Sequence, residues 1–309
     1  MRAPSLAYKN LHWYLHKSDK QMKKAFVLIF FTGIAAALAA QGFSGGFRAG
    51  LNFSRFDGPT AQDAGGQSVE SFNSLTGFSI GATAVYGFTD LVGLKADLMY
   101  SQKGTEYVYD GPSYFTFYNP NTGNETLTLA GNRRVDNNII NTYLDLPLQA
   151  YFRLGKLEIS GGVSMGFLIT SQGAGGLRFT PTESSIAPFS VTLDENYLRD
   201  SRAAATIKEG ESRFFSNKAV NFPSSVGAYY ESTAEDKPLF NRIDLGLVGE
   251  LSFFMNKGLF LSGRLNYGLS DITRNSQHVS LVQRINGQYS LREELHRNLA
   301  IQAGIGFRF

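Results

Sequence analysis

The chain has 309 residues, of which 43% are hydrophobic and 18% charged, with 33 glycines, no cysteine and a formal charge of +3. This composition excludes disorder throughout and is compatible with one large domain or two. The lack of cysteine excludes disulfides, thiolate zinc sites and cysteine nucleophiles.

The first informative segment is internal to the N-terminal region. Met22-Lys23-Lys24 gives a basic start, residues 25–38 are apolar, and Ala37-Leu38-Ala39-Ala40 supplies small residues for cleavage. This order is typical of a signal peptide. A membrane anchor is the competing interpretation, but the apolar run is shorter than the roughly 20 residues that a spanning helix needs. We therefore expect 22–40 to be a signal peptide, 1–21 to be an extension from a start codon assigned too early, and 41–309 to be the mature domain.

The positive net charge of the chain comes from residues 1–40. Residues 1–40 hold six Lys/Arg and one Asp, so removing them from 29 and 26 leaves 23 basic and 25 acidic residues, a formal charge of −2. No nucleic-acid partner is expected from such a balance. No later apolar stretch reaches helix-spanning length, so a membrane location would require strands.

Eight segments of the mature chain alternate apolar and polar side chains with the period of two that β-strands show. In the first segment, for example, Phe47, Leu51 and Phe53 alternate with Arg48 and Asn52. Strands that cross a bilayer need about 9 to 11 residues of this kind, although one such segment fits a soluble sandwich equally well. In chain order the segments cover 43–54, 78–88, 94–101, 143–152, 157–170, 242–253, 259–270 and 299–309.

The connections between these segments alternate in length. Three are tight turns, at 89–92, 153–156 and 255–258; four are long and polar, at 56–75, 103–138, 171–240 and 271–297. Short periplasmic turns and long extracellular loops are the asymmetry of outer-membrane barrels. The sequence therefore predicts an all-β fold, namely a transmembrane antiparallel up-and-down β-barrel of about eight strands, with long extracellular loops and both termini in the periplasm. Apolar residues in 186–193 and 214–230 would allow an extra hairpin and ten strands.

The two faces of the predicted strands differ in charge. The lipid-facing parity carries no Lys, Arg, Asp or Glu, and a charge there would cost about 2 to 4 kcal/mol at the bilayer midplane. An eight-stranded barrel has an interior just wide enough to be filled by side chains, so we expect the charges of the opposite face to pair as a plug. A selectivity ring in a narrow channel is the alternative. The ten residues are Arg48, Lys95, Asp97, Asp145, Glu158, Arg242, Asp244, Glu250, Arg264 and Arg308.

Aromatic residues fall near the ends of the predicted strands. Their positions predict interfacial girdles, formed by Phe53, Tyr100 and Tyr267 at the outer ends and by Phe88, Phe152 and Phe254 near the turns. The terminal Phe309, together with Phe307, matches the C-terminal signal by which bacterial barrels are recognised for membrane insertion.

The mature chain contains few of the side chains that usually act as catalytic nucleophiles or bases. Its histidines, His278 and His296, lie in or beside the last loop, and we interpret them as surface residues. We predict no catalytic residue, no cofactor and no metal site, and the chain is not expected to be an enzyme. The loop acids are interpreted as solvated because they lack the spacing of a known site; they are Asp194, Glu195, Glu209, Glu211, Glu231, Glu235 and Asp236.

Five segments together resemble the PorT-type outer-membrane β-barrel proteins of Bacteroidetes: 49–54, 100–104, 143–148, 267–272 and 304–309. The resemblance implies an eight-stranded barrel that the general barrel-assembly machinery inserts, and it implies no catalytic residues. The function of that family is mostly undefined, and its founding member serves type IX secretion and gliding. The segment 171–240 matches no motif of the family.

Two functions follow as hypotheses. The first is a non-enzymatic barrel in the bacterial outer membrane that contacts outer-membrane lipid and displays its loops for binding, adhesion or assembly with envelope or secretion proteins. The second is a narrow pore or a transport or secretion component. A membrane-embedded enzyme is a third hypothesis, which the poor inventory of nucleophiles and bases disfavours.

Overall fold

The structure is a computed structural model that describes residues 42–309 except 120, 216–217 and 233–236. The expected signal peptide and N-terminal extension lie outside the described residues. Across the described part of the chain, we find no helix that is both long enough and apolar enough to cross a membrane.

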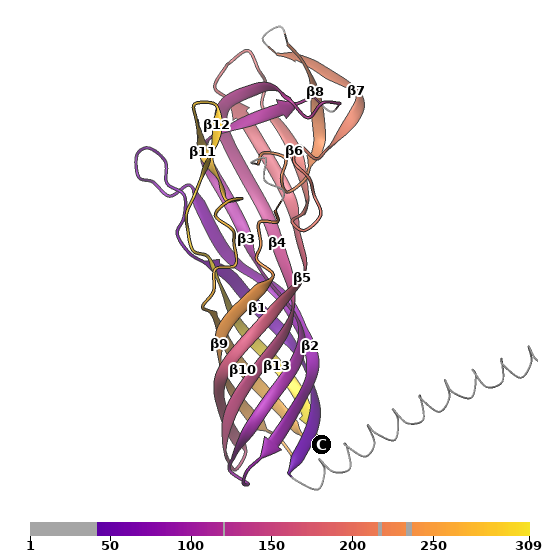
Figure 1. Ribbon diagram of the computed structural model, residues 1–309, viewed down its shortest axis with the longest axis vertical. Helices are drawn as coiled ribbons and strands as arrows, with labels where there is room; N and C mark the ends of the chain where they lie inside the picture. Colours follow the sequence, from indigo (N-terminus) through magenta and orange to yellow (C-terminus); the bar gives the residue numbers. More distant parts are fainter. Residues whose placement is uncertain (1–41, 120, 216–217, 233–236) are drawn as a thin grey trace, which may run out of the picture.

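Eight strands close into a ring in which every neighbouring pair is antiparallel (Figure 1). The order around the ring is β1-β2-β3-β4-β5-β9-β10-β13, and β13 pairs with β1 to close it. The barrel and its strand number are thus as the sequence predicts. The ring strands are β1 (Phe43–Asp57), β2 (Glu70–Gly87), β3 (Val92–Tyr118), β4 (Glu125–Leu154), β5 (Leu157–Pro181), β9 (Ile243–Phe254), β10 (Leu259–Gly268) and β13 (Arg297–Arg308).

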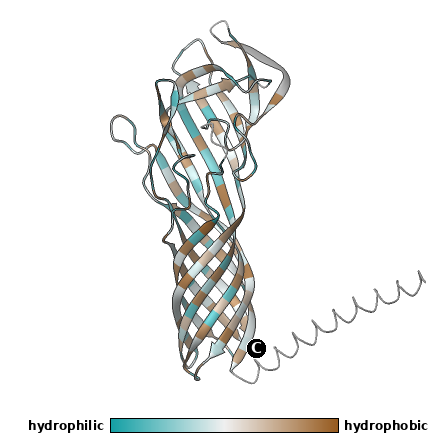
Figure 2. Ribbon diagram, viewed as in Figure 1, coloured by the Kyte–Doolittle hydropathy of each residue, from teal (hydrophilic) through white to brown (hydrophobic). Residues whose placement is uncertain are grey.

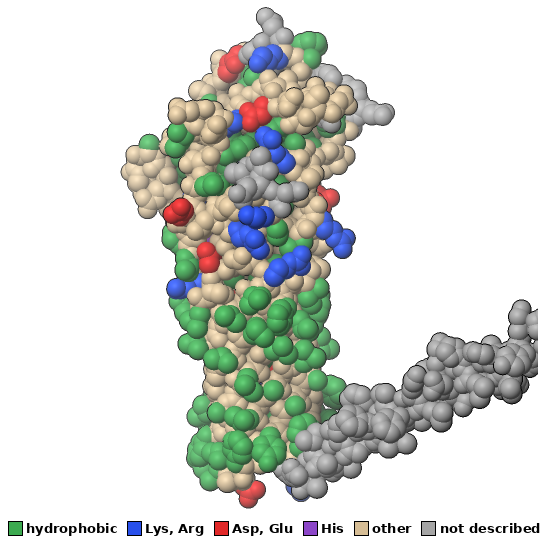
Figure 3. Space-filling model, in the orientation of Figure 1, with side chains coloured by type: hydrophobic (Ala, Val, Ile, Leu, Met, Phe, Trp, Pro, Cys, Tyr) green, Lys and Arg blue, Asp and Glu red, His purple; other side chains and the backbone are tan. Residues whose placement is uncertain are grey.

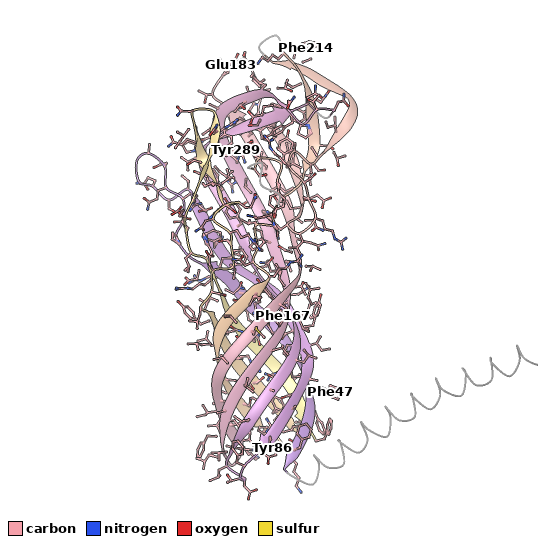
Figure 4. The ribbon with its side chains drawn as sticks, viewed as in Figure 1. Phe47, Tyr86, Phe167, Glu183, Phe214 and Tyr289 are labelled. Carbon is pink, nitrogen blue, oxygen red and sulfur yellow. The ribbon has the colours of Figure 1, made fainter. Side chains whose placement is uncertain are left out.

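The side chains of the ring alternate between inside and outside. In β9 each second residue is buried through the whole strand, and β10 and β13 largely follow the same rule. The outward residues make an apolar band around the lower part of the molecule (Figures 2 and 3). Phe47, Tyr86 and Phe167 point outward in this band (Figure 4). The three tight turns lie at one end of the ring, where the expected connections place them.

Three ring strands continue far beyond the apolar band. β3, β4 and β5 contain 27, 30 and 25 residues, whereas β9, β10 and β13 contain 10 to 12. The predicted loop at 103–138 is therefore wrong over most of its length, because β3 and β4 pair without interruption from Gly104 with Ile140 to Phe117 with Leu127. Above the apolar band the outer face of such strands no longer has to be apolar, so the alternation of apolar and polar residues that marks a membrane strand is lost from the sequence.

The strand extensions form a curved upper sheet. β6 (Phe189–Asn196) pairs with the end of β5, β8 (Lys218–Val226) lies parallel to β6, and β7 (Ala205–Phe215) forms a hairpin with β8. These strands lie outside the ring, so the ten-strand alternative does not hold. A separate hairpin of β11 (Val279–Ile285) and β12 (Gln288–Leu291) packs against β3, where Ser113 Oγ donates to the carbonyl of Leu281 at 2.6 Å.

The upper sheet has its own apolar core. It consists mainly of aromatic rings that pack at centroid distances of 5.0–5.9 Å, among them Phe115, Phe117, Phe179, Phe189 and Phe222. Aromatic pairs at such distances add to the burial of apolar area. The extension is therefore a packed structure that holds its shape above the barrel.

Candidate functional site: a charge-filled barrel interior below an aromatic chamber

The interior of the ring is filled by ion pairs from strands on opposite sides. Arg48 Nη1 lies 3.2 Å from Asp97 Oδ2 and 3.0 Å from Glu250 Oε2, and Arg264 contacts the same two carboxylates. Each of these side chains is at most 6% exposed. Charges buried this deeply are tolerated when every one has a partner of opposite sign.

The same network continues toward the turns. Lys95 Nζ lies 2.9 Å from Glu250 Oε1 and 3.3 Å from Glu158 Oε1, and Arg308 binds Glu158 through two nitrogens at 2.8 and 2.9 Å. The Arg308 guanidinium also lies over the ring of Phe254, 4.9 Å from its centroid. Phe254 is 1% exposed inside the barrel and packs on Phe260, so the girdle position expected for Phe254 is wrong.

A second group of charges lies at the upper end of the interior. Lys103 Nζ donates to Asp145 Oδ1 at 3.0 Å and to Asp244 Oδ2 at 3.3 Å. Asn298 Nδ2 donates to the same oxygen of Asp244 at 2.9 Å. Lys103 falls in the loop predicted at 103–138, but the structure places it in β3, on the same inward face as Lys95 and Asp97. The alternation of the third predicted strand reaches Lys103 when it is extended by two residues.

Nine of the ten charges expected in the interior are buried there, and Arg242 is the exception. Arg242 is exposed at the start of β9, where its Nη1 donates to the carbonyl of Leu168 at 3.4 Å. Lys103 is buried in the interior in place of Arg242. The interior network therefore has five basic and five acidic side chains. Its charge sums to zero, which suits a group of ions removed from water.

Above this plug, the upper sheet and the loops line a partly open chamber of about 190 Å³. Aromatic side chains supply much of its wall, including Phe72, Tyr107, Tyr197, Tyr229 and Phe240. Phe240 and Tyr197 meet edge to face at 5.0 Å, and Tyr229 donates its hydroxyl to the carbonyl of Tyr197 at 2.5 Å. Small-molecule sites usually have walls that are mostly apolar and aromatic, with polar groups placed among them.

The chamber also holds charged groups, each with a partner. Arg133 pairs with Glu231, whose Oε1 accepts from the backbone nitrogen of Thr116 at 2.7 Å. Glu195 accepts from Asn137 Nδ2 at 2.6 Å and from the hydroxyl of Tyr197. Burial raises the pKa of Glu195, although both hydrogen bonds oppose that shift. Glu195 and Glu231 were expected to be solvated loop acids, and here they are part of the chamber wall.

The two histidines line the same chamber instead of lying on the surface. His296 is 1% exposed, and its ring packs edge to face on Phe72 at 5.1 Å. The ring of His278 lies 5.0 Å from that of His296. Burial, with the nearby charge of Arg292, lowers the pKa of His278 to about 3, so this imidazole is neutral at neutral pH. No sequence signal marked the two residues as neighbours.

Comparison with known proteins gives one family match. Residues 39–274 match the family described as "Outer membrane protein beta-barrel domain". No curated protein matches the sequence. Similar solved structures include Ail, the attachment invasion locus protein of Yersinia pestis, at 12% identity and a TM-score of 0.31, covering 87% of this chain and 99% of that one. OprG from Pseudomonas aeruginosa is 12% identical with a TM-score of 0.36, covering 87% and 97%.

Proposed function

This chain belongs to the outer membrane β-barrel domain family, and its barrel lies in the bacterial outer membrane. We propose that it binds a partner at the cell surface and that its barrel does not conduct ions or solutes. The observation that carries the proposal is the position of a partly open aromatic chamber directly beyond an interior filled by ion pairs. The barrel then serves as an anchor, and the extracellular extension does the binding.

The filled interior favours binding over the pore alternative. Side chains from β1, β3, β9 and β10 meet across the ring through Arg48, Asp97 and Glu250, and these contacts support a closed interior. An eight-stranded barrel has little room beyond its own side chains. A conducting state would require these buried ions to separate, and that carries a large desolvation cost.

The chamber suits a compact, largely apolar group that carries hydrogen-bonding atoms. Its aromatic walls provide contact area, and the hydroxyls of Tyr107, Tyr197 and Tyr229 lie among them. Such a group can be a free small molecule or the end of a larger envelope or external partner. We propose no enzymatic role.

Photo-crosslinking in intact cells tests this binding role. A photoreactive residue at Leu239, in the chamber wall, should capture a partner that the same residue at lipid-facing Leu261 does not. Filling the chamber by Ala228→Phe should abolish that product, because Ala228 lines the cavity with a small side chain. Products that are identical at both positions, or none from Leu239 under any growth condition, would contradict the proposal.

We further propose a processing and insertion scheme for the chain. Residues 22–40 would be removed as a signal peptide, 41–309 would form the barrel domain, and Phe307 and Phe309 would present the signal to the barrel-assembly machinery. Three tight turns at one end and long extensions at the other support a periplasmic location of both termini. N-terminal sequencing of the protein in outer-membrane fractions checks the cleavage point.

The resemblance to PorT-type proteins of Bacteroidetes supports a place among envelope or secretion complexes. Affinity purification from crosslinked outer membranes would test it. Recovery of envelope proteins with the wild type and their loss with Ala228→Phe would link that assembly to the chamber, whereas recovery unchanged in the variant would place the contact elsewhere.

A further inference from the structure

We propose that His278, Glu294 and His296 form a binding site for one divalent transition-metal ion such as Zn²⁺, at the base of the β11–β12 hairpin. Each residue offers one ligand atom, and these atoms lie within 4.8 Å of one another. The site does not depend on the proposed binding role of the chamber, because its ligands converge whether or not the chamber holds a ligand.

The hairpin brings these residues together from separate parts of the last loop. His278 immediately precedes β11, whereas Glu294 and His296 lie between β12 and β13. Antiparallel pairing places the two sides next to each other, and the backbone nitrogen of Arg292 donates to the carbonyl of His278 at 2.8 Å. The ligands are thus positioned by backbone hydrogen bonds before any ion binds.

The imidazoles have free lone pairs at the site. His296 Nε2 lies 3.2 Å from the carbonyl oxygen of Pro59. A carbonyl only accepts, so Nε2 carries the proton and Nδ1 keeps its lone pair. Nδ1 of His296 is buried without a hydrogen-bond partner, and so is Nδ1 of His278. A histidine that binds a metal through one nitrogen while the other donates to a backbone carbonyl is the common arrangement.

The surrounding charges also fit a cation. Arg292 pairs with Glu294 and, through Nη1 at 2.8 Å, with Glu70. Two carboxylates and one guanidinium sum to −1, so a divalent ion would not enter a positive environment. The contact between Arg292 and Glu294 holds the carboxylate in place, as partners of metal-binding carboxylates commonly do.

The donor set indicates the class of ion. Two imidazole nitrogens and one carboxylate oxygen, without thiolates, are a typical set for Zn²⁺ with a further position for water or another ligand. Other first-row divalent ions share this preference for imidazole, whereas Mg²⁺ and Ca²⁺ favour oxygen. Because both histidines line the chamber, a bound ion would lie at its wall.

The test measures metal binding by the purified barrel in detergent, freed of metal by a chelator and carrying no histidine tag. Titration with Co²⁺ followed by visible spectroscopy reports binding and geometry, and competition with Zn²⁺ gives the affinity. His278→Gln and Glu294→Gln each remove one ligand with little change in volume. Glu293→Gln is the matched control, because Glu293 is exposed next to the site and outside the ligand set.

We expect one ion per chain in the wild type and in Glu293→Gln, with the d–d absorption of a four- or five-coordinate site. Each ligand variant should bind about tenfold or more weakly, while keeping the wild-type shift in gel mobility on heating that marks a folded barrel. Wild-type protein that binds no stoichiometric ion would overturn the proposal. So would ligand variants that bind as tightly as Glu293→Gln.

Discussion

Lys103 Nζ and Asp145 Oδ1 lie 3.0 Å apart at the upper end of the barrel interior, and neither side chain is more than 5% exposed. Lys103 also holds Asp244, so one ammonium group serves two carboxylates that come from β4 and β9. Without Lys103, two buried negative charges would remain with no cation between them.

Lys103→Met should therefore destabilise the barrel strongly. Removing one partner of a buried ion pair costs about 3 to 5 kcal/mol, and here two acids lose the same partner. The measurement is urea unfolding in lipid vesicles, followed by the heat-dependent shift in gel mobility. Arg242→Met is the matched control, because Arg242 is exposed, and it should change the free energy of unfolding by less than about 0.5 kcal/mol. Equal effects of the two changes would contradict the assigned network.

Gly166→Ala should disturb the same acid by crowding. A Cβ at this position would lie 2.6 Å from Asp145 Oδ1 and 3.2 Å from Tyr143 Cδ1. Overpacking of this kind costs about 1 to 3 kcal/mol. Gly263→Ala offers the comparison, since its Cβ would meet no atom within 4 Å. Unfolding curves of the two variants should separate clearly, and coincident curves would count against the interior geometry.

Conductance measurements test whether the interior is closed. The purified wild type in planar bilayers should give no stable channels, because Arg48, Asp97, Glu250 and Arg264 meet across the ring. The double variant Glu250→Ala/Arg264→Ala removes two long side chains of opposite sign and should conduct measurably. A wild type that conducts as well as this variant would favour the pore hypothesis.

Glu195 should make the stability of the upper sheet depend on pH. Burial raises its pKa above the ordinary 4.5, so the folded protein retains this proton to higher pH than the unfolded chain does. Its contribution to stability is therefore greatest below about 4.5 and is lost as pH rises through the folded pKa. The difference between the infrared spectra of the wild type and Glu195→Gln should contain a protonated-carboxyl band that persists above pH 4.5. A band that titrates at 4.5 in the wild type would refute the shift.

The ring of strands could be predicted from the sequence because the lipid requires every outward side chain of a membrane strand to be apolar. Residues such as Leu51 and Ile301 must be apolar where Asn52 and Gln302 face inward, and this alternation is visible without a structure. Above the lipid this rule ends, so residues 103–118 of β3 and 125–138 of β4 have the sequence pattern of a loop. They are recognisable as strands only through their pairing.

The chamber could not be predicted for a related reason. His278 and His296 are separated by a hairpin whose strands of 7 and 4 residues carry no strong pattern, and their meeting depends on that hairpin folding back. Glu195 and Tyr197 enter the same space from β6 and the turn after it. Irregular connections bring these residues together in the chamber, although they are far apart in the sequence. The local periodicity of the sequence does not predict such contacts.

The cross-ring origin of the interior ion pairs has a consequence for assembly. Arg48 comes from β1 and Asp97 from β3, whereas Glu250 and Arg264 come from β9 and β10. The contacts of Arg48 with Glu250 and of Arg264 with Asp97 therefore require strands on both sides of the β1–β13 seam. Before β1 meets β13, these two cross-seam contacts are absent. Closing the ring therefore couples the removal of these charges from water to their pairing, and a barrel with an open seam lacks that compensation.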